Sequence, residues 1–103
     1  MTEPTAQERL YTALAAIPPG KLITYGQLAA QIGMPKRARW VGQQLGQLPR
    51  DTRLPWHRVV NAQGKSSFPP LSPNHERQHQ LLEQEGVSAN TRGCFDLKAY
   101  GCF

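Results

Sequence analysis

Residues 23–49 of the chain read ITYGQLAAQIGMPKRARWVGQQLGQLP, and this stretch decides the fold. Thr24 can cap a helix over residues 25–32, whose apolar side chains recur at the spacing of one helical face. Residues 33–35, Gly-Met-Pro, predict a tight turn, and a second helix is expected over residues 37–48. Two short helices joined by such a turn are typical of a helix-turn-helix, although any packed helix pair shares the pattern.

The flanking sequence predicts the other parts of a small α/β domain. Thr5 has capping-box spacing to Glu8, so a helix is expected there, stopping at Pro18-Pro19-Gly20. Short strands are expected at residues 22–23 and 58–60, the second followed by a turn and an irregular loop over residues 66–71.

The C-terminal third is expected to hold one helix and a packed tail. Ser72 and Pro73 suit the start of a helix over about residues 73–85, and Gly86 suits its end. In the tail, residues 87–103, we expect Phe95, Leu97 and Tyr100 to pack in an extended conformation on the body of the domain.

Length, charge and cysteine content narrow the class of protein. A chain of 103 residues forms one domain, and its net charge of +5 favours a polyanionic partner such as nucleic acid, although solubilising charge is an alternative. There is no apolar run of membrane-spanning length and no signal pattern, so we expect a soluble, cytoplasmic protein. Cys94 and Cys102 make neither a metal quartet nor a disulfide framework, and no metal or cofactor is expected.

Three motifs follow one another along the chain: IPPGK with TYG (residues 17–26), ARWVG (38–42) and PWHRV (55–59). Their order and spacing resemble the C-terminal domain of the O6-alkylguanine-DNA alkyltransferases. The resemblance runs from about residue 8 to residue 87. It implies a monomeric winged helix-turn-helix domain over residues 1–103, with the helix-turn-helix at about 25–48 and a pocket loop at 50–57.

In those enzymes a Pro-Cys-His-Arg-Val motif carries the cysteine that takes the alkyl group irreversibly. Trp56 stands at that position, which is similar to the non-enzymatic, alkyltransferase-like branch of the family. Dealkylation needs a thiolate, whereas an indole offers only an N–H donor. His57 and Glu85 match the residues that activate the thiol, and here we expect them to remain as a structural pair.

The resemblance also implies a pocket for a flipped base, which needs aromatic or apolar walls. Trp56 is expected to line it, a core tryptophan being the alternative. Its neighbours Pro55 and Val59 are assigned to the same site, and Phe68 with Pro69 to the opposite wall.

Arg39 and Tyr25 are expected to act on the DNA itself. The resemblance implies that Arg39 enters the base stack, where a planar cation can fill the gap left by the extruded nucleotide. Tyr25 would meet the phosphate beside the target, a core tyrosine being the alternative. Other candidates for DNA contacts lie in the turn, the second helix and the basic segments: Thr24, Lys36, Arg37, Ala38, Arg50, Arg53, Arg58 and Trp40, which could also pack internally.

The resemblance therefore implies a sensor that binds duplex DNA containing O6-alkylguanine, flips the damaged nucleotide and marks it for nucleotide excision repair. One alternative is an active alkyltransferase using Cys94 or Cys102, although a thiol without a base is mostly protonated at neutral pH. The other is a regulator that binds undamaged DNA, which usually needs a dimer and paired half-sites.

Overall fold

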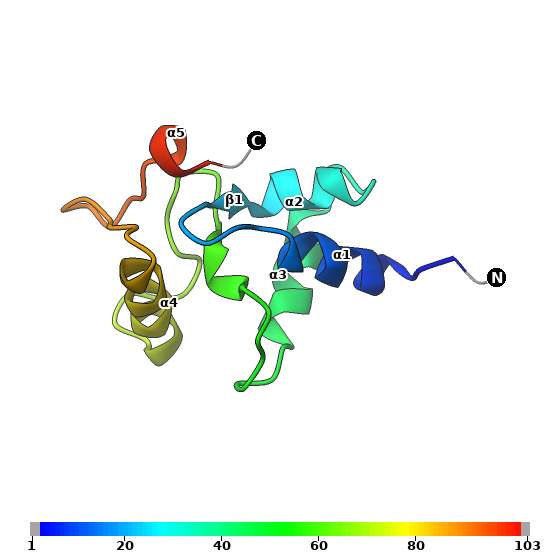
Figure 1. Ribbon diagram of the computed structural model, residues 1–103, viewed down its shortest axis with the longest axis horizontal. Helices are drawn as coiled ribbons and strands as arrows, with labels where there is room; N and C mark the ends of the chain where they lie inside the picture. The colour runs from blue at the N-terminus through cyan, green and yellow to red at the C-terminus, as the bar shows by residue number, and fades with distance from the viewer. Residues whose placement is uncertain (1–2, 102–103) are drawn as a thin grey trace.

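The predicted helix-turn-helix is present in the structure, a computed structural model that describes residues 3–101 (Figure 1). It consists of α2 (Tyr25–Gln31) and α3 (Ala38–Gly46). Thr24 caps α2 as expected, because its hydroxyl accepts a hydrogen bond from the backbone N–H of Gln27. The Gln27 side chain in turn accepts from the Thr24 N–H, which completes a capping box.

Two short strands join this pair of helices to the rest of the domain. β1 (Ile23–Thr24) and β2 (Val59–Val60) form a parallel two-stranded sheet in which Ile23 is opposite Val59 and Thr24 is opposite Val60. The residue that precedes α2 is therefore paired with the chain just after the PWHRV motif. Arg58, predicted to begin the second strand, belongs instead to a 3-10 turn, η1 (Trp56–Arg58).

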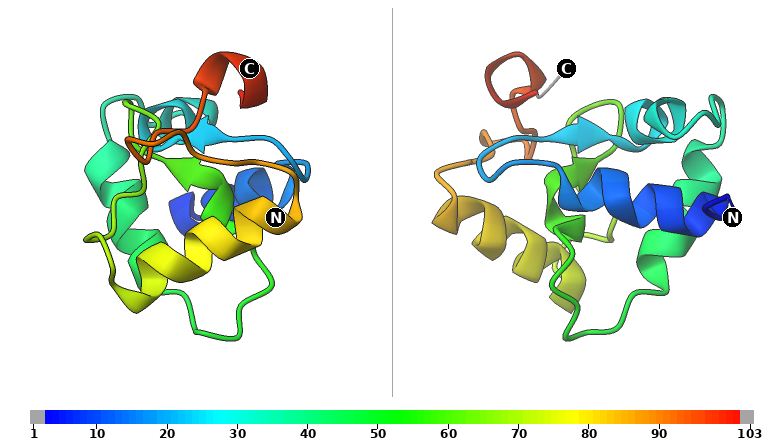
Figure 2. Two further views of the ribbon diagram at one scale, coloured as in Figure 1. Left: turned by 90° about the vertical axis from the view of Figure 1, so that its left-hand side faces the viewer. Right: turned by 45° about the vertical axis from the view of Figure 1, so that its right-hand side comes forward.

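The sheet separates two clusters of buried apolar side chains. Ile23 and Val59 face the cluster formed with α1 (Ala6–Ala15), α2 and α3, whereas Leu22 and Val60 face the cluster formed with α4 (Pro73–Gln84) and the tail. Because successive strand residues point to opposite faces, one short sheet serves both clusters. Figures 1 and 2 show this arrangement, with α4 at one end of the molecule and the helix-turn-helix at the other.

The capping residues of α1 and α4 are also those expected from the sequence. The Thr5 hydroxyl accepts from the Glu8 N–H, and the Ser72 hydroxyl accepts from the His75 N–H with Pro73 in the first turn. Gly86 follows α4 with a φ of +82°, a conformation that glycine adopts without strain. None of the helices over residues 3–101 has both the length and the apolar character needed to span a bilayer.

The tail differs from its prediction. Phe95 is buried against α4 as expected, but Leu97 and Tyr100 lie in a short helix, α5 (Leu97–Tyr100), rather than in extended chain. Asp96 explains the difference, because its carboxylate accepts hydrogen bonds from the N–H groups of the first turn. The segment that corresponds to a wing, residues 61–72, is a loop within which no strand forms.

Candidate functional site

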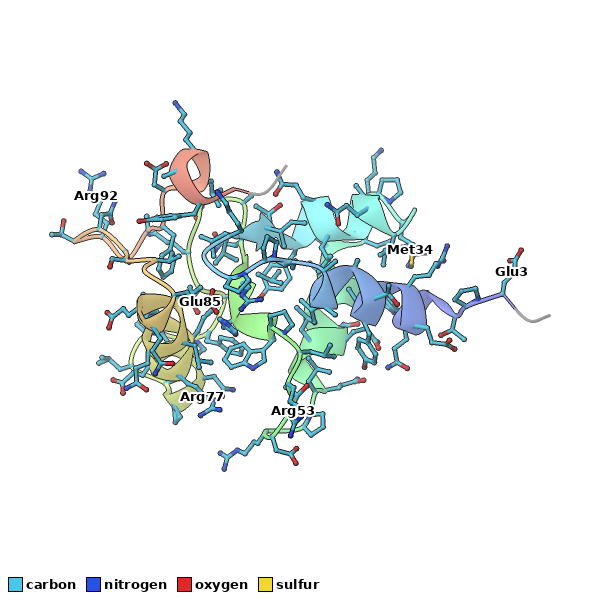
Figure 3. All side chains as sticks on the ribbon, viewed as in Figure 1. Glu3, Met34, Arg53, Arg77, Glu85 and Arg92 are labelled. Atoms are coloured by element: carbon cyan, nitrogen blue, oxygen red, sulfur yellow. The ribbon has the colours of Figure 1, made fainter. Side chains whose placement is uncertain are left out.

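Glu85, just after the end of α4, joins three separate segments of the chain. Its carboxylate lies 2.6 Å from Nε2 of His57 and accepts hydrogen bonds from Nε and Nη2 of Arg58 at 2.8–3.1 Å. It also accepts from the backbone N–H of Gly20 at 2.9 Å, while Nη1 of Arg58 donates to the carbonyl of Ile17. Glu85, labelled in Figure 3, thus binds the PWHRV motif to the end of α4 and to the loop before β1.

The electrostatics of this cluster keep Glu85 ionised. Burial raises the pKa of Glu85, but the hydrogen bonds from Arg58, Gly20 and His57 outweigh it and lower the pKa to about 2. Arg58 is therefore committed to a structural ion pair, which corrects its prediction as a phosphate contact. His57 and Glu85 form the pair expected from the sequence.

Gln78 of α4 supports η1 from a second direction. Its side chain is 1% exposed, and its Nε2 donates to the carbonyls of His57 and Val59 at 3.1 and 3.0 Å. The backbone on both sides of Arg58 is therefore hydrogen-bonded to one helix. These bonds hold η1 in place and so help to set the direction of the Trp56 side chain.

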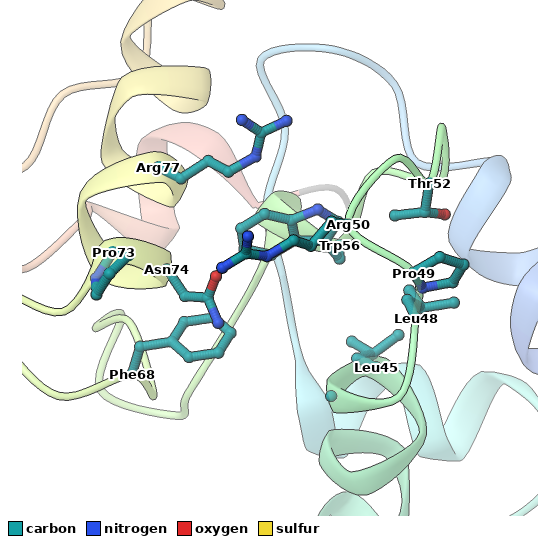
Figure 4. A pocket seen from close by; sticks show the side chains of 11 residues that line it. Leu45, Leu48, Pro49, Arg50, Thr52, Trp56, Phe68, Pro73, Asn74 and Arg77 are labelled. Atoms are coloured by element: carbon teal, nitrogen blue, oxygen red, sulfur yellow. The ribbon is translucent and has the colours of Figure 1, made fainter.

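Trp56 lines a cavity of about 400 Å³, here called the Trp56 pocket, which lies between the end of α3, the pocket loop and the start of α4 (Figure 4). Its indole meets the Phe68 ring edge-on, at 5.8 Å between centroids. The volume lies within the range of about 300–1,000 Å³ typical of small-molecule sites. The lining residues are Leu45, Gly46, Leu48, Pro49, Arg50, Thr52, Trp56, Phe68, Pro73, Asn74 and Arg77.

Three residues assigned to this pocket lie elsewhere. Val59 is fully buried in the core, because its place in β2 directs its side chain between the helices. Pro55 is buried beside the pocket, and Pro69 is exposed, and neither lines it. Asn74 and Arg77 line the pocket although no sequence motif pointed to them; their three-residue separation on α4 places both on one helical face.

Tyr25 and Arg39 line a second hollow, here called the Tyr25 hollow, between the N-terminal ends of α2 and α3 and the loop after β2. The Tyr25 hydroxyl lies 2.7 Å from Oγ of Ser67. Burial raises the pKa of Tyr25 more than this hydrogen bond lowers it, so the phenol stays protonated at neutral pH. Thr24, Gly26, Ala38, Gly42, Gln43, Asn61, Ala62 and Ser67 complete the lining.

The chain matches the family described as the DNA-binding domain of 6-O-methylguanine DNA methyltransferase, over residues 5–87. It belongs to this methyltransferase family. Alkyltransferase-like protein 1 of Schizosaccharomyces pombe is 46% identical over 79 residues, covering 77% of this chain and 73% of that protein. The DNA base-flipping protein of Escherichia coli K12 is 43% identical over 98 residues, covering 95% of this chain and 74% of that protein.

The fold agrees with that of a solved relative. The structure of S. pombe Atl1 in complex with damaged DNA containing O6-carboxymethylguanine matches with a TM-score of 0.84 at 36% identity, covering 100% of this chain and 99% of the other. This likeness confirms the predicted fold class, a small domain of helices with a small sheet, and the prediction of the alkyltransferase-like branch.

The basic residues of this methyltransferase-family domain divide into bound and free groups. Ion pairs within residues 3–101 all end on Glu85. Lys36, Arg37 and Arg39 are exposed around the start of α3, where cations without protein partners can meet phosphates. Trp40 is half-buried and packs against the core, in agreement with the alternative that it packs internally.

The remaining sequence predictions concern Thr24, the cysteines and metal ions. Thr24 borders the Tyr25 hollow but is 8% exposed, and its hydroxyl is used in the helix cap, so its side chain is a poor DNA contact. Cys94 lies partly buried in a tail turn, and within residues 3–101 no hydrogen bond reaches its Sγ; Cys102 lies outside the described residues. The described residues contain no cluster of three or more side chains suited to a metal ion.

Proposed function

We propose that this chain is a non-enzymatic sensor of O6-alkylguanine in duplex DNA, which holds the flipped damaged base in the Trp56 pocket and transfers no alkyl group. The position of Trp56 carries the proposal. Its half-buried indole lines the pocket next to the His57–Glu85 pair, at the motif position where the enzymes have their cysteine.

The chemistry of the pocket agrees with binding without reaction. Nε2 of His57 is bonded to Glu85, and the ring centroids of His57 and Trp56 lie 6.1 Å apart in an edge-on arrangement. The indole has no lone pair comparable to that of a thiolate, so this pair has no nucleophile to activate. Trp56 and Phe68 instead offer aromatic surface, and stacking contributes about 1–3 kcal/mol per base.

The Tyr25 hollow supplies the groups that nucleotide flipping needs. Arg39 is exposed at the start of α3 and can stack in the gap left by the extruded base, while Tyr25, which lines the same hollow, is the residue we expect to meet the phosphate beside it. The relatives support this assignment: one is named a DNA base-flipping protein, and another was solved on DNA containing O6-carboxymethylguanine.

A sensor without turnover needs a second system to remove the lesion. We assign that step to nucleotide excision repair proteins, on the family resemblance, and we expect the chain to bind DNA as a monomer. Stable binding marks the lesion because the protein has no reaction that would end the complex.

The test is fluorescence-anisotropy binding to a short duplex with one O6-methylguanine and to the same duplex with guanine, at one salt concentration. We expect at least about tenfold tighter binding to the damaged duplex, equivalent to about 1.4 kcal/mol, with no change in the intact mass of the protein. Trp56→Ala should lose most of this preference. A mass increase would support the alkyltransferase alternative, and equal affinity for both duplexes would support the regulator.

A further inference from the structure

The charged side chains that line the Trp56 pocket are all positive. Its lining contains two charged side chains, Arg50 and Arg77, and no carboxylate. Figure 4 shows that they come from different elements, Arg50 from the pocket loop and Arg77 from α4, and that Asn74 comes from the same helix as Arg77. Both arginines are exposed, so their guanidinium groups keep the freedom to turn toward an occupant of the pocket.

Neither arginine is neutralised by the protein. The ion pairs of residues 3–101 involve only His57, Arg58 and Glu85. On α4 the positions three and four residues from Arg77 hold no acidic side chain; they are Pro73, Asn74, Gln80 and Leu81. An anion in the pocket therefore has no internal carboxylate to displace.

This charge lies beside the aromatic walls that would hold a guanine. If a base is stacked on Trp56 with its O6 atom toward the start of α4, the polar part of the lining receives the substituent on that atom. A guanidinium group binds a carboxylate through two parallel hydrogen bonds, and the Asn74 amide can add another donor. A neutral group of the same size would cover the same arginines without offering them a charged acceptor with two oxygens, so the lost hydration is less well compensated.

We propose that Arg50 and Arg77 make the Trp56 pocket selective for O6-alkyl groups that end in a carboxylate, such as carboxymethyl, over neutral groups of the same size. This inference rests on the proposed function, because it names the class of lesion that the same pocket prefers.

The test compares two lesions of similar size and different charge. Duplexes with a single O6-carboxymethylguanine or O6-(2-hydroxyethyl)guanine are titrated at one salt concentration, alongside the guanine duplex. We expect the wild type to bind the carboxymethyl lesion about three- to tenfold more tightly than the hydroxyethyl lesion, the range of a partly exposed charge pair. Arg77→Gln should reduce this ratio, and Arg50→Gln with Arg77→Gln should bring it close to one.

Arg53→Gln is the matched control. It removes one positive charge from the same loop as Arg50, but Arg53 does not line the pocket and lies at the outer end of the loop in Figure 3. It should weaken all three duplexes by a similar factor and leave the ratio unchanged. Arg77→Lys should retain part of the ratio, because it keeps the charge and loses the paired donors.

The outcomes separate this inference from the proposed function. If both lesions bind more tightly than guanine with equal affinity, the sensor stands and the charge selectivity is wrong. If Arg77→Gln weakens all duplexes equally, Arg77 contacts the DNA backbone and the inference is also wrong. If neither lesion is preferred over guanine, the proposed function itself fails.

Discussion

The hydroxyl of Tyr25 and the hydroxyl of Ser67 lie 2.7 Å apart, which joins the start of α2 to a loop 42 residues later in the chain. Phe68, the next residue, meets Trp56 edge-on in the other cavity. One loop therefore forms a wall of both the Tyr25 hollow and the Trp56 pocket. Tyr25, the expected contact to the DNA backbone, is therefore connected through Ser67 to Phe68, the residue next to Ser67 and a wall of the pocket proposed for the base.

Ser67→Ala removes the partner of Tyr25 and should loosen this shared wall. We expect a loss of at most about 0.5–1.5 kcal/mol in the free energy of unfolding, because the hydrogen bond is exposed. The preference for damaged over undamaged duplex should fall by a larger factor than stability alone explains. Urea unfolding and anisotropy binding measure the two effects, with the exposed Ser88→Ala as control. Unchanged preference in the Ser67 variant would show that the contact does not organise the pocket.

Arg39→Ala should abolish most of the discrimination between damaged and undamaged DNA. Flipping costs a few kcal/mol, and Arg39, which lines the Tyr25 hollow, is the side chain proposed to fill the vacated stack. Arg37→Ala is the matched comparison: the residue is exposed nearby and lines neither cavity. It should weaken both duplexes equally and reduce the salt dependence of binding. Similar behaviour of the two variants would assign Arg39 to simple phosphate binding.

Glu85→Gln should destabilise the fold at neutral pH by about 2 kcal/mol, since it leaves Arg58 without its counter-charge. The pKa of Glu85 is lowered from 4.5 to about 2 in the folded state, so the unfolded chain binds the proton first as pH falls. The stabilisation is complete above pH 4.5 and is lost between pH 4.5 and 2. Urea unfolding at several pH values should show this loss in the wild type and a weaker pH dependence in the variant. Equal slopes would contradict the assignment.

His79→Phe should remove a different pH dependence. The His79 ring lies between His75, at 4.4 Å, and Phe95, at 5.0 Å, and its Nε2 is buried without a hydrogen-bond partner. Burial lowers the pKa of His79 below 6.5, with a further contribution from His75. The unfolded chain therefore takes up the proton first, and stability falls as pH drops below 6.5. Thermal unfolding at pH 7.5 and 5.5 should show a smaller decrease for the variant than for the wild type.

The helices could be predicted from the sequence because their signals are local. Thr5, Thr24 and Ser72 each cap the helix expected of them, and the turn between α2 and α3 lies where glycine and proline place it. α5 was missed because four residues carry no periodicity, and its start depends on a single side chain, Asp96.

The site was harder to predict because it depends on contacts between distant segments. The motifs identified Tyr25, Arg39 and Trp56, but the chain order could not show that the first two line one cavity and the third another. Val59 is buried because β2 packs against α1, α2 and α3, and Arg58 is bound to Glu85 because α4 ends beside the PWHRV motif. No local pattern reports either contact. The packing of α4 also brings Arg77 beside Trp56.

The two-stranded sheet fixes the distance between the Tyr25 hollow and the Trp56 pocket. Thr24 and Val60 are paired, Tyr25 follows Thr24 directly, and Trp56 precedes Val59 by three positions. Adjacent strands lie about 4.8 Å apart, so this pairing sets the span between the groups expected to grip the sugar-phosphate chain and the surface expected to receive the base. The covalent structure of a nucleotide limits the distance between its phosphate and its base. A residue inserted between Trp56 and Val59 should therefore change the distance between the two cavities and weaken the binding of a nucleotide that has to reach both.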